Sequence, residues 1–255
     1  MKLSKIHFFQ KHLIGALNNK IVNCTLLCAL LIYSGVVFFP GLMFDNSFSY
    51  KNVNIYSADS LRDELRLIID EVDVLLYKSE IYNSEKTQNI YLCNNYLLYS
   101  FFAPFSRKAF ACYNPLTNNI FVAKYDIKRN ESYKNNDKDV YTRSLSEVLA
   151  HEITHNAIRS KLGYLRFITL DTWINEGYSE FIAKGSTNNY ELIKAVTSQN
   201  KTNDKPGEIY IKYYLAVNYL ITSKGMNFSE IVSSRRSLNE VLHEIELKLK
   251  LNKQY

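Results

Sequence analysis

The longest apolar run of the chain lies near its N-terminus. Residues 21–44 carry no charged side chain and are almost wholly hydrophobic. Because about 20 apolar residues in a helix cross the hydrocarbon core of a bilayer, we expect a transmembrane helix at 21–44. Basic residues precede the run and acidic residues follow it, which predicts that residues 1–20 form a cytoplasmic tail.

A cleaved signal peptide is the alternative interpretation of this run. The run is longer than the apolar core of a usual signal peptide, and no clear small-x-small cleavage site follows it. We therefore favour an uncleaved single-pass anchor. In either case, residues 45–255 are expected to form one periplasmic or extracellular domain.

Beyond residue 45 the pattern changes several times. Residues 45–56 are polar enough to predict a tether, and apolar side chains then recur at helical spacing up to Leu76. Short β-branched and aromatic runs follow, and they predict strands at 90–93, 97–102, 109–113 and 120–125. Asn114–Asn119 predicts a hairpin turn between the last two, and a polar stretch (128–138) leads into helices.

This order of elements predicts an α+β fold, in which a small mixed β-sheet lobe packs on a helical lobe. The net charge of +6 includes four lysines before residue 45, so the rest of the chain carries only +2. A nucleic-acid-binding domain normally concentrates its basic residues on the folded part. We therefore expect no nucleic-acid partner.

The four cysteines fall into two pairs. Cys24 and Cys28 lie inside the apolar run, where they are expected to act as small apolar side chains. Cys93 and Cys112 lie in predicted strands of the exported part, and an oxidising compartment favours a disulfide between them. Two buried free thiols are the alternative.

The most informative segment is residues 144–155, SLSEVLAHEITH. Ser144 and Glu147 have the spacing of a capping box, so a helix should begin there and end near Gly163. His151 and His155 are four residues apart and share one face of this helix. Two imidazoles in this arrangement can bind one Zn²⁺, while Glu152 can act as a base toward a water.

A catalytic zinc ion needs a third protein ligand. The other histidine of the exported part, His243, lies far away on a C-terminal amphipathic stretch, so a carboxylate is the better candidate. A second short helix is predicted over 171–185, with Asp171 or Thr172 as its cap. It carries Glu176 and Glu180 on one face.

HEITH, followed after 20 intervening residues by the glutamate of WINEGYSEF, resembles the gluzincin peptidases, above all the aminopeptidase N-like (peptidase MA-like) clan. The resemblance implies a zincin-like fold, one Zn²⁺ and Glu176 as its third ligand. The interval is two residues longer than is usual in the family. Glu180 is the alternative ligand, although a role in holding a ligand histidine is favoured, and Gly177 should let this helix approach the histidine helix closely.

Residues 210–225 resemble the family's helix that begins with a catalytic tyrosine, which maps onto Tyr210. In the family this hydroxyl donates to the oxyanion of the tetrahedral intermediate. Tyr213 and Tyr214 are alternatives for this role, and packing in the core is the plain alternative for Tyr210. The sheet region lacks the family's motif for a free amino group, so exopeptidase activity is not implied.

The sequence as a whole predicts a membrane-anchored, zinc-dependent peptidase that acts on a peptide or protein substrate. His151, His155 and Glu176 would bind zinc, Glu152 would serve as general base and Tyr210 would stabilise the oxyanion. We also expect the strand at 119–125 to be an edge strand that pairs with the substrate. The alternative is a membrane-anchored binding or structural protein that retains zinc only for stability.

Overall fold

The computed structural model describes residues 2–61, 63–134, 142–187 and 206–251, and the chain divides into two units, Met1–Asp45 and Asn46–Tyr255. The first unit holds α1 (Lys2–Phe38) and the short 3-10 helix η1 (Pro40–Met43). Its Lys20–Phe38 part is long and apolar enough to span a membrane, a property that a signal sequence shares. The helix ends six residues earlier than expected, because Pro40 disfavours a helical conformation at the residue before it.

The second unit is built on a mixed five-stranded sheet in the order β1-β2-β3-β5-β4. Its central strands β2 (Val53–Ser57), β3 (Gln88–Leu92) and β5 (Asn119–Val122) are parallel. The outer strands β1 (Asn46–Tyr50) and β4 (Ala111–Asn114) pair antiparallel with their neighbours. This arrangement agrees with the expected mixed sheet in an α+β protein.

The predicted tether at 45–56 is wrong, because most of it forms the β1–β2 hairpin. The turn of this hairpin contains Lys51, whose φ is 52°. Val53 and Ile55 alternate with polar residues and are buried, which is the pattern of a strand with one face toward a core. The polar positions that suggested a tether belong to its other face.

The segment 97–102 is also corrected, since it belongs to helix α3 (Tyr96–Phe102) rather than to a strand. The Oδ1 atom of Asn95 accepts hydrogen bonds from the backbone N–H groups of Leu97 and Leu98, and this N-cap favours a helix. Tyr99 and Phe102 are three residues apart, so both face the interior, where Phe102 stacks on Phe121.

A second, three-stranded antiparallel sheet follows, with β6 (Lys124–Asp126), β7 (Glu131–Tyr133) and β8 (Thr142–Ser144). The expected polar stretch therefore contains one strand, and its last residues lie outside the described part of the chain. The expected hairpin turn at 114–119 is confirmed between β4 and β5.

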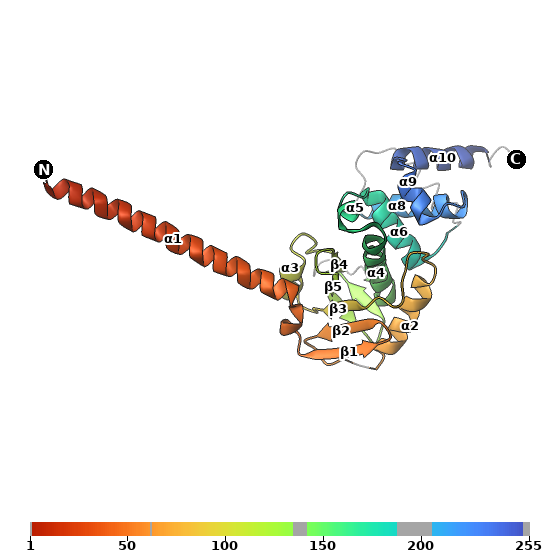
Figure 1. Ribbon diagram of the computed structural model, residues 1–255. Helices are drawn as coiled ribbons and strands as arrows, with labels where there is room; N and C mark the ends of the chain where they lie inside the picture. The colour runs from red at the N-terminus through yellow and green to blue at the C-terminus, as the bar shows by residue number, and fades with distance from the viewer. Residues whose placement is uncertain (1, 62, 135–141, 188–205, 252–255) are drawn as a thin grey trace. The chain divides into compact units, whose positions relative to one another are not determined.

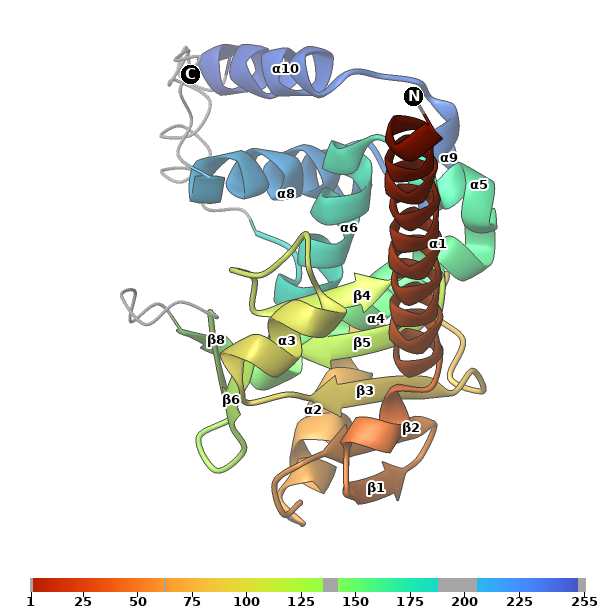
Figure 2. The same cartoon turned by 90° about the vertical axis from the view of Figure 1, so that its left-hand side faces the viewer.

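Helices make up most of the remainder, as Figures 1 and 2 show. They are α2 (Leu65–Leu76), α4 (Leu145–Leu162), α5 (Tyr164–Ile168), α6 (Thr172–Lys184), α8 (Pro206–Thr222), α9 (Phe228–Ser233) and α10 (Leu238–Leu251). The inward side chains of the strands, such as Ile55, Ile90 and Ile120, share one core with α2 and α4. On the side of α4 away from the sheet, α6 packs against both α4 and α8.

The expected disulfide between Cys93 and Cys112 is absent, and both are free thiols. The strand order explains this result: Cys112 lies on β4, Cys93 directly follows β3, and β5 lies between these two strands. The backbone N–H of Cys93 donates to the carbonyl of Val122 on β5. Burial raises the pKa of each thiol to about 12.

Candidate metal centre

Helix α4 begins directly after Ser144, as expected, but the expected capping box does not form. The Ser144 side chain makes no capping hydrogen bond and instead lies 2.7 Å from the Ser146 hydroxyl. Asn130 caps the helix, because its Oδ1 accepts from the backbone N–H of Ser146 and its carbonyl accepts from that of Leu145. The helix ends at Gly163, whose φ of 79° favours glycine.

The middle of α4 is buried on nearly every side, including its polar residues. His151 and Glu152 are each 8% exposed and His155 is 7% exposed. Burying so many polar side chains is costly unless each has a partner. The partners come from α6, β4 and β8, and together they define the candidate metal centre.

Helix α6 is the second element of the centre and ends at Gly185, as expected. The predicted role of Gly177 is wrong, because its close approach is to α8 rather than to the histidine helix. A Cβ atom at Gly177 would lie 2.5 Å from the Tyr213 carbonyl oxygen and 2.7 Å from a methyl group of Val217. Glycine at this position lets α6 and α8 cross with their backbones almost in contact.

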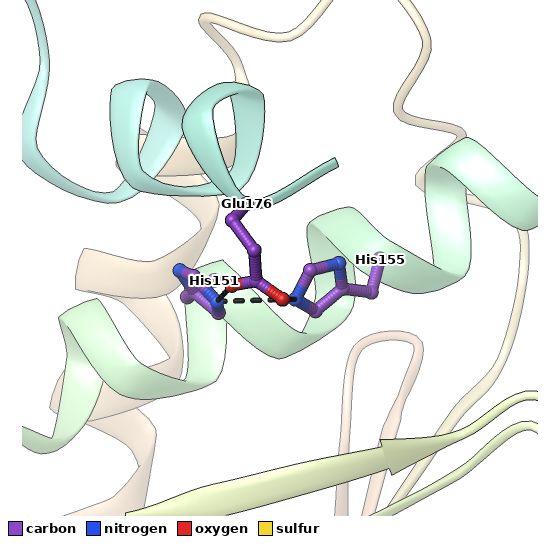
Figure 3. Close-up of side chains that lie close together, drawn as sticks. All are labelled: His151, His155 and Glu176. Carbon is purple, nitrogen blue, oxygen red and sulfur yellow. Dashed lines mark hydrogen bonds and ion pairs between the residues drawn. The ribbon is translucent and has the colours of Figure 1, made fainter. Parts of the chain in front are cut away.

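His151, His155 and Glu176 converge on one point between α4 and α6 (Figure 3). The two Nε2 atoms are 3.1 Å apart, and Glu176 places Oε2 3.3 Å from Nε2 of His151 and Oε1 3.8 Å from Nε2 of His155. Ligands about 2.0–2.1 Å from a tetrahedral Zn²⁺ are about 3.3–3.4 Å apart. The three side chains could therefore hold one metal ion.

The Nδ1 atoms of the two rings, their outer nitrogens, point away from the position between the Nε2 atoms, and their neighbours favour a cation at that position. Nδ1 of His155 lies 2.9 Å from Oδ1 of Asn175, and Nδ1 of His151 lies 3.5 Å from Oε1 of Glu180. Asn175 Oδ1 is an acceptor, so Nδ1 of His155 can donate to it and leave the Nε2 lone pair of that ring facing the Glu176 carboxylate. The Nδ1 of His151 makes no hydrogen bond but lies beside the Glu180 carboxylate, so both rings stand among carboxylate and amide oxygens that favour a cation between them.

Glu180 lies beside the outer nitrogen of His151, and its role in holding this histidine stays a prediction. Its carboxylate also accepts two hydrogen bonds from the guanidinium of Arg143, at 2.8 and 3.2 Å, and pairs with Lys184 at 3.0 Å. Burial raises the pKa of Glu180, but His151, Arg143 and Lys184 outweigh it and lower the pKa to about 2. The group is therefore a fixed anion.

Glu152 follows His151 directly, and its carboxylate is buried beside the same point. Burial raises its pKa to about 7, and the negative charge of Glu176 acts in the same direction. The charge of His155 and a hydrogen bond from the backbone N–H of Tyr113 act in the opposite direction. For Glu176, by contrast, burial raises the pKa but the two histidines outweigh it, so its pKa is lowered.

Strand β4 lies alongside α4, and its position corrects the expectation for 119–125. β5 is paired on both sides, with β3 and β4, so it is not an edge strand. Within the described residues, β4 is the outer strand on this side of the sheet, and the backbone N–H of Tyr113 on it donates to Glu152. The edge formed by β4, which pairs with no further strand among the described residues, thus runs beside the candidate centre.

Tyr210 lies in the first part of α8 and is 44% exposed. Burial raises its pKa, and the charges of Glu176, Glu152 and Glu180 contribute to the rise, so Tyr210 lies within electrostatic range of the carboxylates of the centre. The ring of Tyr213 lies 5.9 Å from that of Tyr210. Tyr214 is a poorer candidate, because it is buried and its hydroxyl donates to the Gly185 carbonyl at 2.8 Å.

Sequence reasoning missed Arg143, Asn175 and Ser179, which surround the histidines. The Ser179 hydroxyl lies 3.2 Å from Nδ1 of His155. Asn175 and Ser179 are four residues apart, as are Glu176 and Glu180, so a helical projection of 171–185 places each pair on one face. No spacing in the sequence indicates Arg143, because it lies on β8 and meets Glu180 only through the tertiary fold.

A search of protein-family models found no match for this chain, and a search of the curated proteins found none either. The interpretation of the centre therefore depends on its own geometry and on the motifs of the sequence. The arrangement is that of two histidines and one carboxylate able to hold a metal ion, with a buried carboxylic acid of raised pKa beside it.

Proposed function

We propose that this protein is a membrane-anchored, zinc-dependent peptidase of the gluzincin type with a zincin-like fold. The observation that carries the proposal is the buried Glu152 beside the group formed by His151, His155 and Glu176. A site built only to bind metal for stability gains nothing from a further buried carboxylate. A hydrolytic site needs this group as a base.

The donor set favours zinc among the common metal ions. Two imidazole nitrogens and one carboxylate form a set typical of catalytic Zn²⁺ sites, which keep one position open for water or substrate. Ca²⁺ and Mg²⁺ prefer sets made entirely of oxygen ligands. When bound, the metal would supply a Lewis acid that acidifies a water molecule and polarises a peptide carbonyl.

The chain's own residues would carry out the proton transfers. Glu152 would take a proton from the attacking water and deliver it to the nitrogen of the leaving amine. A pKa of about 7 suits both tasks, because the carboxyl group can release and accept a proton near neutral pH. The Tyr210 hydroxyl would donate a hydrogen bond to the oxyanion that develops on the substrate carbonyl.

The outer edge of β4 would bind the substrate. An extended peptide can add to an exposed strand through main-chain hydrogen bonds, with little demand on its own sequence. Because β4 packs against α4, a peptide added there would run past Glu152. This role replaces the one first expected for 119–125.

The proposed location follows from the N-terminal part of the chain. Lys20–Phe38 would span the membrane once, with the preceding basic residues in the cytoplasm and the second unit in the periplasm or outside the cell. Peptides or proteins in that compartment would be the substrates.

Metal analysis and a peptide digest of the purified full-length chain test the proposal together. We expect about one zinc per chain and cleavage of a random peptide library. Both should be lost on chelation and recovered when zinc is added back. Stable zinc without cleavage would favour the structural alternative, and cleavage that survives complete removal of metal would contradict the proposal.

A further inference from the structure

Helix α3 exposes apolar side chains beside those that it buries. Leu97 is 77% exposed, and Phe105, in the loop after the helix, is fully exposed. Tyr96 and Phe101 are exposed to 46% and 36%. We call these four residues the α3 patch. All four lie within residues 96–105, and large exposed apolar side chains that form one patch mark an interaction surface.

The register of the sheet places this patch next to the point where the chain enters the second unit. Asn46 pairs with Ser57, and Ser57 pairs with Leu92, so these three residues lie in one row across the sheet. With strands about 4.8 Å apart, Asn46 and Leu92 are separated by about 10 Å. Leu92 is followed four residues later by α3, which lies at this end of the sheet (Figure 2).

The connection from the candidate membrane span to the sheet is short. Seven residues, 39–45, separate the end of α1 from β1. Even fully extended they reach at most about 25 Å, which is little more than half the diameter of about 44 Å that follows from the radius of gyration of about 17 Å of a compact domain of about 200 residues. A span at Lys20–Phe38 would therefore hold the Asn46 end of the sheet close to the bilayer surface.

The charges around the patch suit a lipid surface. Residues 86–125 contain four basic residues and no Asp or Glu. Arg107 and Lys108, both exposed, come two and three residues after Phe105. Asp59, an acid that follows β2 at this end of the sheet, already accepts hydrogen bonds from the Asn94 amide and the Tyr125 hydroxyl. Apolar side chains flanked by cations are typical of segments that bind the headgroup region of a membrane.

We propose that the α3 patch docks into the outer leaflet of the membrane that anchors the chain. The inference rests on the proposed membrane anchoring. Leu97 and Phe105 enter the region between headgroups and acyl chains, and Arg107 and Lys108 contact lipid phosphates. The domain is then held in one orientation at the bilayer rather than turning freely on its connection.

Fluorescence quenching in reconstituted vesicles tests this docking in the full-length chain. The reporter variants are Leu97→Trp and Phe105→Trp, and the vesicles contain phosphatidylcholine and phosphatidylglycerol with bromine near the glycerol end of the acyl chains. The matched control is Leu116→Trp, because Leu116 is 60% exposed and lies in the β4–β5 turn, at the opposite end of the sheet. The native Trp173 is 7% exposed and supplies a background measured in the parent chain.

We expect the added tryptophans at 97 and 105 to lose about half of their emission or more, since docked apolar side chains enter about 5–10 Å into the bilayer. The tryptophan at 116 should be unaffected. Equal quenching at all three positions, or none at 97 and 105, would overturn the docking while leaving the anchor and the peptidase intact. A patch that serves instead to bind apolar substrates would give the second of these results. A chain that fails to float with the vesicles would refute the anchoring itself, and the docking with it.

Discussion

The two walls of the candidate metal centre are built very differently. On the wall formed by α4 and α6, the two histidines and Glu180 are almost fully buried, and each contacts further polar groups that fix its orientation. On the α8 wall, Tyr210 is 44% exposed. This wall is positioned mainly by backbone packing against Gly177.

This difference indicates a division of roles within the site. The α4–α6 wall is buried and already holds its donor atoms near the spacing of a zinc site. It should therefore govern metal affinity. The α8 wall adds a hydroxyl that matters only when substrate reacts, so it should govern turnover. The variants below test this division, from the largest expected effect to the smallest.

Removing a donor from the α4–α6 wall should have the largest effect. His151→Ala, His155→Ala and Glu176→Ala should each abolish retention of zinc, since loss of one ligand of three opens the site. His243→Ala is the matched control, because His243 is exposed on α10 and should leave zinc content unchanged. Metal analysis after desalting measures the effect. Full retention of zinc in Glu176→Ala would transfer the ligand role to Glu180.

Removing the hydroxyl from the α8 wall should affect turnover alone. Tyr210→Phe should lower kcat by about a hundredfold, the typical effect of losing one oxyanion donor. Zinc content and KM should stay unchanged, because the interaction exists only in the transition state. Tyr213→Phe and Tyr214→Phe are assayed beside it. If Tyr210→Phe keeps full activity and Tyr213→Phe is impaired, the oxyanion donor is Tyr213, one turn further along α8.

The residues beside the outer nitrogens of the two histidines should contribute unequally to zinc affinity. Glu180→Gln should weaken zinc binding by about 10–100-fold, because it removes the anion beside His151. Asn175→Ala should have a smaller effect, since the Ser179 hydroxyl still lies 3.2 Å from Nδ1 of His155. Competition with a chelator of known affinity gives both constants. An equal loss in the two variants would show that the charge of Glu180 is unimportant.

The crossing of α6 and α8 should be sensitive to a single methyl group. Gly177→Ala should lower the free energy of unfolding by about 1–3 kcal/mol, since the new Cβ overlaps the Tyr213 carbonyl and overpacks the contact. Gly207→Ala, in the first turn of α8, is the matched control, because a Cβ there meets no atom within 4 Å. Thermal unfolding of the two variants measures the difference. Equal stability of the two variants would mean that α6 and α8 can move apart to accommodate the methyl group without loss of stability.

The parts of the site that could be predicted from the sequence are those set by local spacing. The positions of His151 and His155 on one helix face, and of Glu176 and Glu180 on another, follow from the period of an α-helix. The ends of α4 and α6 at glycines follow from the positive φ there, which glycine adopts without steric cost. These features needed no knowledge of the rest of the chain.

The errors have in common that they depend on which elements become neighbours. The aromatic run of α3 has the composition of a strand. The segment forms a helix instead, which the Asn95 cap and the packing on Phe121 stabilise. The order β3-β5-β4 separates Cys93 from Cys112 and makes β4 the edge. Gly177 was correctly expected to allow a close approach, but only the packing of α6 shows that its neighbour is α8.

The most direct test of the central claim is to measure hydrolysis and zinc content together in Glu152→Gln. The amide keeps the shape of the carboxyl group but cannot act as a base. We expect zinc to be retained while peptide hydrolysis falls by about 100-fold or more. Glu147→Gln, a change of the same kind on a partly exposed residue of the same helix, should keep both. Hydrolysis at the parent rate in Glu152→Gln would contradict the account.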